Sequence, residues 1–328
     1  MSLSIQHIST CFPVTILDNQ KLSAEFNILP EDIFKKTGIN KRFVSAPDEI
    51  ASDLAFQAAV NLFSEGKVDK YSIDFLIFCS EGFDYIAPAT SCILQHRLGL
   101  STKTGCIDLP YGCSGYVYGL MIAAGLLETG AAQRVLFLTA DIPTKVLSAD
   151  DLELRSVFSD IGTASLLTLD KTQKITQFCY GTDGNGALDL YVERSGFRNP
   201  ITVDFIDKTK LPGGKMLMNG TNVFLFAIKR VPTLIKEILE KNNKAIEDID
   251  LFIFHQANAY MLEILRKKIK IPKDKFFTNI DEHGNSVSSS IPVALCDAEQ
   301  KGILKRGMTV LLAGFGIGNS WNATIIKY

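Results

Sequence analysis

One cysteine of this chain has the surroundings of a nucleophile. Cys113 lies in the sequence Leu-Pro-Tyr-Gly-Cys-Ser-Gly-Tyr, directly before the apolar, small-residue stretch 117–127, which predicts a buried helix. A thiol at a helix start faces unpaired backbone N–H groups and the positive end of the helix dipole, so we expect its pKa to be lowered and the thiolate to be favoured. The alternative is a small buried hydrophobe, which is what most free cysteines are. The segment alone leaves both interpretations open.

Two other segments carry polar side chains that could act beside a thiol. His255 follows the apolar run 251–254 and precedes Gln-Ala-Asn, so a strand is expected to deliver it to a loop. Asn285 lies in His-Gly-Asn-Ser-Val-Ser-Ser-Ser-Ile-Pro, a Gly-Asn turn that leads into a helix rich in small residues. A neutral imidazole and an amide are donors that can stabilise an enolate oxygen. A lone histidine in such a place is more often structural, so the interpretation of His255 depends on Asn285.

A glycine-rich turn follows the apolar run 310–313. Its sequence, Gly-Phe-Gly-Ile-Gly-Asn-Ser-Trp, begins at Gly314. It is weak as a phosphate-binding loop, because it lacks both the complete dinucleotide spacing and a Gly-Lys-Ser/Thr ending. Glycines that alternate after a strand can instead aim a backbone N–H group at a developing oxyanion, which points to Gly316 and Ile317. The alternative is a tight packing turn.

The elements that must position these residues repeat along the chain. Apolar strand-like runs alternate with helix-like stretches, which favours an α/β fold with strands buried on both faces. Three pairs of segments resemble each other in the same order: 72–79 and 248–255 at an offset of 176 (248 − 72), 134–138 and 309–313 at an offset of 175 (309 − 134), and 161–167 and 317–323 at an offset of 156 (317 − 161). The smaller last offset predicts an insertion at 143–160. The order of the pairs predicts a duplicated unit with halves 1–170 and 171–328.

The repeat also predicts where the candidate residues meet. His255 corresponds to Cys79, and Asn285 corresponds roughly to Cys113 at an offset of 172 (285 − 113). Equivalent positions of two packed halves lie at the same end of the core. We therefore expect Cys113, His255 and Asn285 to converge there.

Composition excludes several classes of protein. The chain has 328 residues, of which 46% are hydrophobic and 21% charged, enough for two hydrophobic cores. Lys and Arg number 34 against 36 Asp and Glu, and this net charge of −2 gives no electrostatic case for nucleic acid. No run approaches the roughly 18 uncharged residues of a membrane span, and no signal-peptide pattern is present, so we expect a soluble cytoplasmic protein without a membrane partner. Seven cysteines without a Cys-x-x-Cys spacing argue against a disulfide framework and a zinc site, so no metal is expected.

The catalytic motifs, in this order, resemble the 3-oxoacyl-[acyl-carrier-protein] synthase III family of the thiolase-like fold. Further matches extend the resemblance along nearly the whole chain: Lys36-Thr37-Gly38-Ile39, Pro88-Ala89-Thr90 and Phe158-Ser159-Asp160. The resemblance implies a five-layered, duplicated α/β/α/β/α fold and a homodimer. It also implies a triad of Cys113, His255 and Asn285, with an oxyanion hole formed by backbone N–H groups of Cys113 and the Gly316–Ile317 turn.

The resemblance implies a reaction as well. Cys113 would attack an acyl thioester, and the carbanion formed when malonyl-acyl carrier protein loses carbon dioxide would then attack the acyl-enzyme, as in fatty acid or related polyketide-type biosynthesis. No metal or redox cofactor would be required, and the substrates would be thioesters of coenzyme A or phosphopantetheine. Two alternatives stay open: acyl transfer to a small alcohol, amine or other nucleophile on the same fold, and a non-enzymatic carrier-binding subunit of a heterodimer.

The family also implies contacts with substrate and carrier. A pantetheine tunnel would have Thr37 and Asn258 at its mouth, with Lys36 and Arg155 as phosphate partners. An acidic acyl carrier protein would dock on three basic residues of one helix-like stretch, for which the alternative is a solvated helix face: Arg266, Lys267 and Lys268.

Two departures from the family pattern concern the acyl donor. Members primed by acetyl-coenzyme A often have a tryptophan in the stretch that here reads Glu-Asp-Ile-Phe at 31–34. Where the family often places a phenylalanine that closes the acyl pocket across the dimer interface, this chain has Ala87. A methyl group in place of a ring leaves room for methylenes, so we expect a preference for donors longer or bulkier than acetyl.

Overall fold

The strands form two sheets of one design. The computed structural model describes residues 2–64, 68–170, 176–209 and 214–328. The first five-stranded sheet has the order β1-β7-β6-β4-β5, and the second, read from the equivalent edge, has the order β8-β14-β13-β11-β12. In each sheet the first two neighbouring pairs are antiparallel and the last two are parallel. The strands are β1 (Ser2–Cys11), β4 (Phe75–Cys79), β5 (Gly105–Leu109), β6 (Val135–Asp141), β7 (Ile161–Asp170), β8 (Phe178–Thr182), β11 (Leu251–Phe254), β12 (Phe276–Phe277), β13 (Thr309–Gly316) and β14 (Ser320–Lys327).

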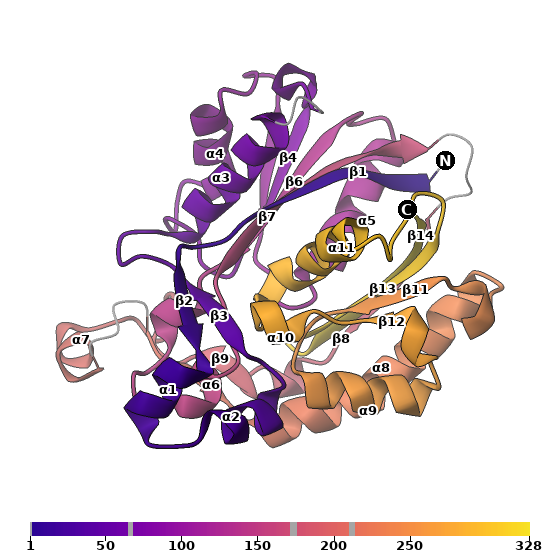
Figure 1. Cartoon of the computed structure of the whole chain (residues 1–328). Helices are drawn as coiled ribbons and strands as arrows, with labels where there is room; N and C mark the ends of the chain where they lie inside the picture. Colours follow the sequence, from indigo (N-terminus) through magenta and orange to yellow (C-terminus); the bar gives the residue numbers. More distant parts are fainter. Residues whose placement is uncertain (1, 65–67, 171–175, 210–213) are drawn as a thin grey trace.

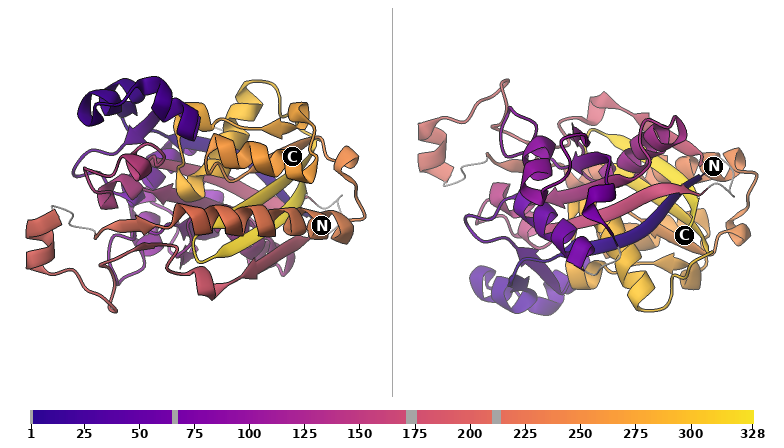
Figure 2. Two further views of the ribbon diagram at one scale, coloured as in Figure 1. Left: turned by 90° about the horizontal axis from the view of Figure 1, so that it is seen from below. Right: turned by 90° about the horizontal axis from the view of Figure 1, so that it is seen from above.

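Helices cover both sheets and fill the space between them (Figure 1). Two helices pack on the outer face of the first sheet, α3 (Ala51–Ser64) and α4 (Thr90–Leu98). Two others lie side by side across the outer face of the second sheet, α8 (Gly220–Lys241) and α9 (Ala259–Ile269), as the left view of Figure 2 shows. The middle layer consists of α5 (Gly115–Glu128) and α11 (Ser290–Gln300). The five-layered, duplicated architecture expected from the sequence is confirmed.

The small residues of the middle-layer helix α5 allow it to pack closely between the two sheets. The predicted buried helix at 117–127 is confirmed as part of α5, which packs between the two sheets. A Cβ atom at Gly119 would lie only 2.1 Å from the ring of Phe137, so the missing side chain lets α5 approach β6. The strands β4 and β6 are almost fully buried, as expected for strands covered on both faces.

The ladders correct one of the predicted offsets. Val135 and Val310 are equivalent positions on β6 and β13, and they pair with Leu167 and Ile326 on the next strands. The third repeat therefore has an offset of 159 (326 − 167), and the predicted 156 was wrong. Residues 317–319, which the repeat places in a strand, form the turn that precedes β14.

The predicted insertion is present between β6 and β7. It contains η2 (Pro143–Val146) and α6 (Leu152–Arg155), whereas only the short turn 317–319 joins the equivalent strands of the second half. The boundary between halves 1–170 and 171–328 stays a prediction, because 171–175 lie outside the described residues.

The other elements lie around the two sheets, and α7 extends outward from them (Figure 2). Of the helices in the described ranges, none has the length and apolarity that crossing a membrane requires. The remaining elements are β2 (Thr15–Asp18), α1 (Asn19–Phe26), α2 (Pro30–Thr37), β3 (Lys41–Val44), η1 (Lys70–Ser72), η3 (Gly184–Gly186), β9 (Leu190–Val192), α7 (Val203–Thr209), β10 (Met216–Met218), η4 (Ile246–Asp248), η5 (Lys273–Lys275), α10 (Ile280–His283) and η6 (Val287–Ser289).

Candidate active site

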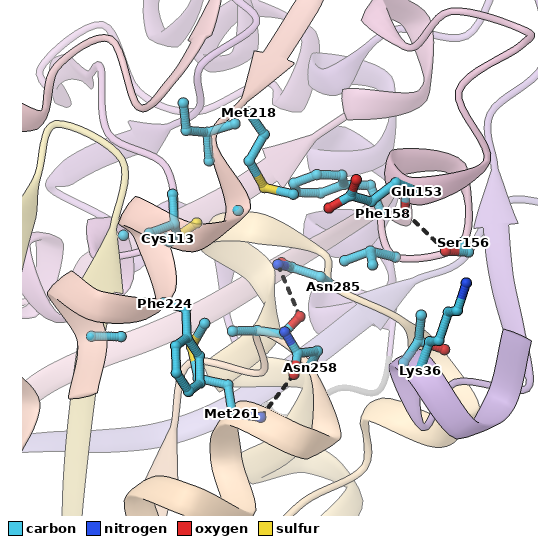
Figure 3. Close-up of a pocket in the computed structure, with 18 of the residues that line it drawn as sticks. Lys36, Cys113, Glu153, Ser156, Phe158, Met218, Phe224, Asn258, Met261 and Asn285 are labelled. Carbon is cyan, nitrogen blue, oxygen red and sulfur yellow. Dashed lines mark hydrogen bonds between the residues drawn. The ribbon is translucent and has the colours of Figure 1, made fainter.

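The three candidate residues converge on one cavity. Cys113, His255 and Asn285 all line a cavity of about 1030 Å³, together with Gly316 of β13. In Figure 3, Cys113 and Asn285 face a common space, and Lys36 lies at the far end of the residues drawn. Cys113 precedes α5 of the first half, whereas His255 and Asn285 follow β11 and precede α11 of the second half. The cavity therefore depends on both halves.

Cys113 occupies the turn between β5 and α5. Its side chain is 5% exposed, and a Cβ atom at Gly316 would lie 2.5 Å from Cys113 Cβ and 2.9 Å from its Sγ. Only glycine lets this turn approach the thiol so closely. The backbone N–H groups of Ile317 and of Cys113 itself hydrogen bond the sulfur. The role of these two N–H groups as an oxyanion hole stays a prediction.

The acidity of Cys113 differs from the sequence-based expectation. Burial raises the pKa of the Cys113 thiol well above its usual range, and the charge of Glu81 adds to the increase. The hydrogen bonds from the N–H groups of Ile317 and Cys113 lower the pKa but do not compensate. The expected lowering at the helix start was wrong, because the turn lies in the core rather than at an open helix end. Burial therefore favours the neutral thiol of Cys113 over the thiolate before the reaction.

Burial favours the neutral imidazole of His255, and its Nδ1 contacts a serine hydroxyl. It is 2% exposed, and burial lowers its pKa to about 3, against which a hydrogen bond to the backbone of Val287 acts. Its Nδ1 lies 2.7 Å from Ser290 Oγ. The Ser290 hydroxyl can accept from Nδ1–H or donate to Nδ1, so it can serve either tautomer of the ring.

Asn285 has its amide oriented by the backbone. The N–H of Val287 donates to Asn285 Oδ1 at 2.9 Å, and Asn285 Nδ2 donates to the carbonyl of Ala257 at 3.4 Å. The backbone of Asn285 forms a bridge to the first half, with N–H donating to Val157 O and the N–H of Ser159 donating to Asn285 O, both at 2.9 Å. The oxygen is thus occupied, and the amide nitrogen is the group available as a donor.

Each half holds the reactive turn of the other. The Ser114 hydroxyl of the cysteine turn lies 2.6 Å from that of Ser320 on β14, and Asn322 Nδ2 donates to Ser114 O at 3.2 Å. In the other direction, the Ser289 hydroxyl donates to Ile161 O at 2.9 Å and lies 2.9 Å from Thr139 Oγ1. These reciprocal bonds fix the separation of the two turns.

Comparisons with known proteins agree with this geometry. The model of the 3-oxoacyl-[acyl-carrier-protein] synthase III family matches residues 107–184, and that of the family's C-terminal region matches 239–328. The beta-ketoacyl-[acyl-carrier-protein] synthase III of Caldanaerobacter subterraneus is 33% identical over 317 residues, which cover 96% of this chain and 95% of that protein. The synthase III of Clostridium acetobutylicum is 31% identical over 327 residues, 100% of this chain and 99% of that protein.

The chain belongs to the 3-oxoacyl-[acyl-carrier-protein] synthase III family. A solved 3-oxoacyl-(acyl-carrier-protein) synthase III superposes with a TM-score of 0.95 at 40% identity and covers 99% of both chains. The synthase III of Thermus thermophilus superposes with a TM-score of 0.89 at 32% identity, also over 99% of both chains. The predicted family and thiolase-like fold are confirmed.

Three of the substrate contacts implied by the family line the cavity: Lys36, Thr37 and Asn258. The Thr37 hydroxyl donates to Ile33 O at 3.0 Å within its own helix, and Asn258 Oδ1 accepts the N–H of Met261 at 2.8 Å as the N-cap of α9. Lys36 is exposed and has its charge at the cavity wall. Of these three, Lys36 is the one suited to an anionic group.

Two other predicted contacts do not belong to the cavity lining of the single chain. Arg155 Nη1 lies 2.7 Å from Glu25 Oε2 and donates to Ala149 O at 2.7 Å, so its charge is already paired. Ala87 lies on an exposed loop whose neighbours Tyr85 and Ile86 are also exposed. The roles expected for Arg155 and Ala87 stay predictions.

The basic residues of α9 are less available than their sequence suggests. Arg266 makes a double hydrogen bond to Glu263, at 2.7 and 2.8 Å, and donates to Ile271 O. Lys268 donates to Ile228 O of α8 at 2.8 Å. Lys267 remains 68% exposed, although Glu263 lies 3.3 Å away. Of the three predicted docking residues, Lys267 and Lys268 are exposed, and docking at them stays a prediction.

One wall of the cavity lies outside the predicted site residues. The first turns of α8 line it through Val223, Phe224 and Ala227, and Met218 of β10 and Phe158 of the insertion lie nearby (Figure 3). The signal was present at Asn219, which precedes an amphipathic run and caps α8 by accepting the N–H of Asn222.

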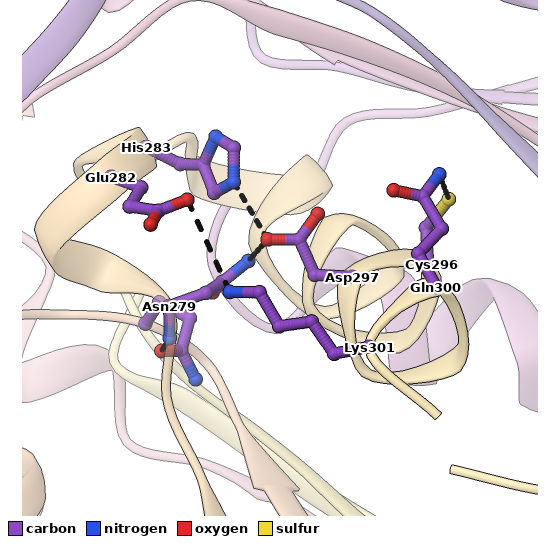
Figure 4. Close-up of polar contacts among 8 residues, drawn as sticks. Asn279, Glu282, His283, Cys296, Asp297, Gln300 and Lys301 are labelled. Carbon is purple, nitrogen blue, oxygen red and sulfur yellow. Dashed lines mark hydrogen bonds and ion pairs between the residues drawn. The ribbon is translucent and has the colours of Figure 1, made fainter. Parts of the chain in front are cut away.

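One group of side chains among the described residues has the composition of a metal site: Glu282, His283 and Asp297. Asp297 Oδ2 is occupied by His283 Nε2 at 2.7 Å and by Asn279 Nδ2 at 3.0 Å, and the ammonium of Lys301 lies 4.0 Å from Glu282 (Figure 4). These bonds fasten α10 to α11, beside the Asn285 turn. We interpret the group as a structural clamp.

Proposed function

We propose that this chain catalyses the decarboxylating condensation of an acyl thioester with malonyl-acyl carrier protein, in fatty acid biosynthesis, through an acyl-Cys113 intermediate. The observation that carries the proposal is the convergence of Cys113, His255 and Asn285 on one cavity, with two backbone N–H groups at the sulfur. The relatives that the chain resembles are named for this synthase activity.

In the first stage the neutral thiol needs a base as it attacks. Burial lowers the pKa of His255 and so favours the neutral imidazole, whose Nε2 can accept the proton of Cys113 while the sulfur attacks the acyl carbonyl. The N–H groups of Cys113 and Ile317 stabilise the tetrahedral oxyanion. The departing thiolate takes the proton from His255, which leaves acyl-Cys113 and a free thiol.

In the second stage His255 and Asn285 stabilise an enolate. The carbonyl oxygen of the malonyl thioester accepts hydrogen bonds from Asn285 Nδ2 and from His255 Nε2, after proton exchange with water has moved the ring proton from Nδ1 to Nε2 and left the Ser290 hydroxyl donating to Nδ1. The bond to the carboxylate breaks, carbon dioxide leaves, and its electron pair forms the carbanion that attacks acyl-Cys113. Collapse of the second oxyanion expels the Cys113 thiolate and releases a 3-oxoacyl thioester.

The substrates supply what the reaction needs besides the side chains. Loss of carbon dioxide provides the electron pair for carbon–carbon bond formation, so the proposal includes no metal or redox cofactor. Lys36 at the cavity wall fits a phosphate of coenzyme A or phosphopantetheine. An apolar cluster around Cys113, which includes Leu147, Phe158 and Met216, fits an aliphatic acyl chain.

Exposed apolar side chains at one edge of the first sheet support a homodimer. Strand β5 is an edge of the first sheet, with Ile107 exposed at 41%, and the neighbouring loop exposes Tyr85 and Ile86 at 64% and 79%. An open edge beside exposed apolar side chains favours pairing with a second copy. In that assembly Ala87 would lie close to the partner, as the family resemblance implies.

The experiment for the activity uses the purified protein, an acyl-coenzyme A and malonyl-acyl carrier protein labelled at the free carboxyl group. We expect release of labelled carbon dioxide together with a 3-oxoacyl-carrier product. Acyl transfer without carbon dioxide release would instead support the alternative acceptor. Absence of both reactions would support the non-catalytic subunit.

Carrier docking is tested at Lys267, an exposed basic side chain of α9. Lys267→Glu should raise the KM for malonyl-acyl carrier protein about three- to tenfold at low salt, with a smaller effect at high salt, because an exposed charge is screened. Lys236→Glu, on α8, is the matched control for an exposed lysine next to a glutamate. An equal KM for both variants would mean that Lys267 belongs to an ordinary solvated helix face and has no role in docking.

A further inference from the structure

A buried carboxylate that the mechanism does not use lies behind the reactive turns. Asp141 is the last residue of β6, is 3% exposed and does not line the cavity. Its Oδ2 accepts the Ser288 hydroxyl at 2.5 Å and the Ser288 N–H at 3.1 Å. Its Oδ1 accepts the N–H of Glu81 at 2.8 Å, with the Ser80 hydroxyl at 3.5 Å. One side chain of the first half thus fastens the turn η6 of the second half.

That turn carries the contacts that orient both enolate-stabilising groups. The N–H of Val287 holds Asn285 Oδ1, and the backbone of Val287 also bonds the ring of His255. Ser290, which follows the turn, places its hydroxyl oxygen 2.7 Å from His255 Nδ1 and 3.0 Å from Val287 O. A shift of η6 would therefore displace the amide and the imidazole together.

The backbone of η6 needs such support. Val287 has φ of 54°, in the left-handed region, which a β-branched residue rarely adopts because its side chain crowds the backbone. A conformation of this kind persists only where the surroundings determine it. Ser288, the next residue, is where Asp141 bonds both the hydroxyl and the N–H.

We propose that Asp141 is a positioning residue that holds the Val287–Ser289 turn so that Asn285 and His255 present their donors to the malonyl thioester. The inference rests on the proposed function, since it assigns a role within the decarboxylation stage. The Cys113 turn has its own anchors, because Ser114 is held by Ser320 and Asn322 of β14. Loss of Asp141 should consequently impair decarboxylation much more than acylation of Cys113.

The experiment measures the two stages separately in Asp141→Asn. This substitution keeps the size of the side chain but replaces an acceptor atom with a donor, so it cannot satisfy both Ser288 and Glu81. Acylation of Cys113, followed by intact mass with acyl-coenzyme A alone, should stay within about threefold of wild type or become faster. Decarboxylation of malonyl-acyl carrier protein by the acylated enzyme should fall about 30-fold in kcat with little change in KM.

Two further variants keep the proposal falsifiable if Asp141→Asn folds poorly. Ser288→Ala removes one donor and leaves the backbone bond, so a smaller loss of about fivefold in the same stage is expected. Asp74→Asn is the matched control, because Asp74 also accepts two backbone N–H groups, from Gln133 and Arg134, but at the opposite ends of the strands. Its stability should fall without any separation of the two stages.

The outcomes are distinct. Equal losses in both stages, or decarboxylation by Asp141→Asn and Ser288→Ala at the wild-type rate, would overturn the assignment of Asp141. A wild-type protein that forms acyl-Cys113 but releases no carbon dioxide would instead overturn the proposed function, and the positioning role would fall with it.

Discussion

The two halves of the molecule share one topology but differ at every position where chemistry takes place. Cys79 ends β4, and His255 occupies the equivalent position directly after β11. The Cys79 thiol is fully buried and donates to Tyr111 O at 3.1 Å, whereas His255 lines the cavity. A Cβ atom at Gly115 would lie 2.4 Å from Cys79 Sγ, so the start of α5 seals that strand end. The duplication supplies the scaffold, and local departures from it supply the reactivity.

The departure has a structural cause. The helix α5 begins two residues after Cys113, whereas the turn η6 separates Asn285 from the start of α11 at Ser290. Ser290, the first residue of α11, contacts His255 Nδ1 through its hydroxyl, whereas the start of α5 packs directly on Cys79 Sγ. The ends of the next strands differ as well, since Asp141 and Gly316 occupy equivalent positions. The first half contributes the nucleophile and a buried anchor, and the second contributes the donors and the close-packed glycine.

The strongest test of this asymmetry compares two cysteines of the first half. Cys113→Ala should abolish formation of the acyl-enzyme, and Cys113→Ser should be nearly as inactive because a hydroxyl is a weaker nucleophile. Cys79→Ala, at the position equivalent to His255, should leave acylation within about threefold of wild type. Intact mass after incubation with acyl-coenzyme A gives the readout. A stoichiometric adduct on a protein lacking Cys113 would contradict the assignment.

The next test separates the contributions of the two halves to the reaction. Asn285→Ala should still acylate Cys113 but should lose a factor on the order of 10²–10³ in decarboxylation, the usual cost of removing one such donor. The measurements are adduct formation and carbon dioxide release in the same preparation. If acylation declined as much as decarboxylation, the division of roles between the halves would be wrong.

Much of this asymmetry could be predicted from the sequence, because the relevant signals are local. The glycines around Cys113, the strand before His255 and the Gly-Asn turn at Asn285 are all contiguous motifs, and the repeat predicted that they would meet. Residues that act through contacts between distant segments could not be found in this way. Asp141 and Ser288 meet across the two halves, and the sequence shows neither their contact nor the burial that raises the Cys113 pKa.

A third test uses the pKa of His255, which follows strand β11 in the second half. Burial lowers the pKa of His255 in the folded chain to about 3, whereas in the unfolded chain it is about 6.5. As pH falls below about 6.5, the unfolded chain binds a proton at His255 and the folded chain does not, so the free energy of unfolding decreases. From pH 7.5 to 5, wild type should lose about 2 kcal/mol more unfolding free energy than His255→Asn. Urea unfolding at the two pH values measures this. Cys79 is a neutral thiol over that range, because burial raises its pKa, so Cys79→Ala should track wild type; an equal loss in His255→Asn would contradict the neutral imidazole.

The smallest expected effect concerns Ala87, which lies in the loop after β4 of the first half. Ala87 is exposed in the single chain, and in the proposed homodimer it would lie close to the second copy. A methyl group in place of a ring leaves space for methylenes, each worth about 0.8 kcal/mol when buried, or about fourfold in kcat/KM. Wild type should therefore prefer medium-chain donors over acetyl-coenzyme A, and Ala87→Phe should shift the preference toward acetyl. Ala89→Phe, on the same exposed loop, is the control for the added ring. If wild type preferred acetyl-coenzyme A and neither substitution changed that preference, the space at Ala87 would have no part in donor choice, and the apolar cluster around Cys113 would have to set the chain length alone.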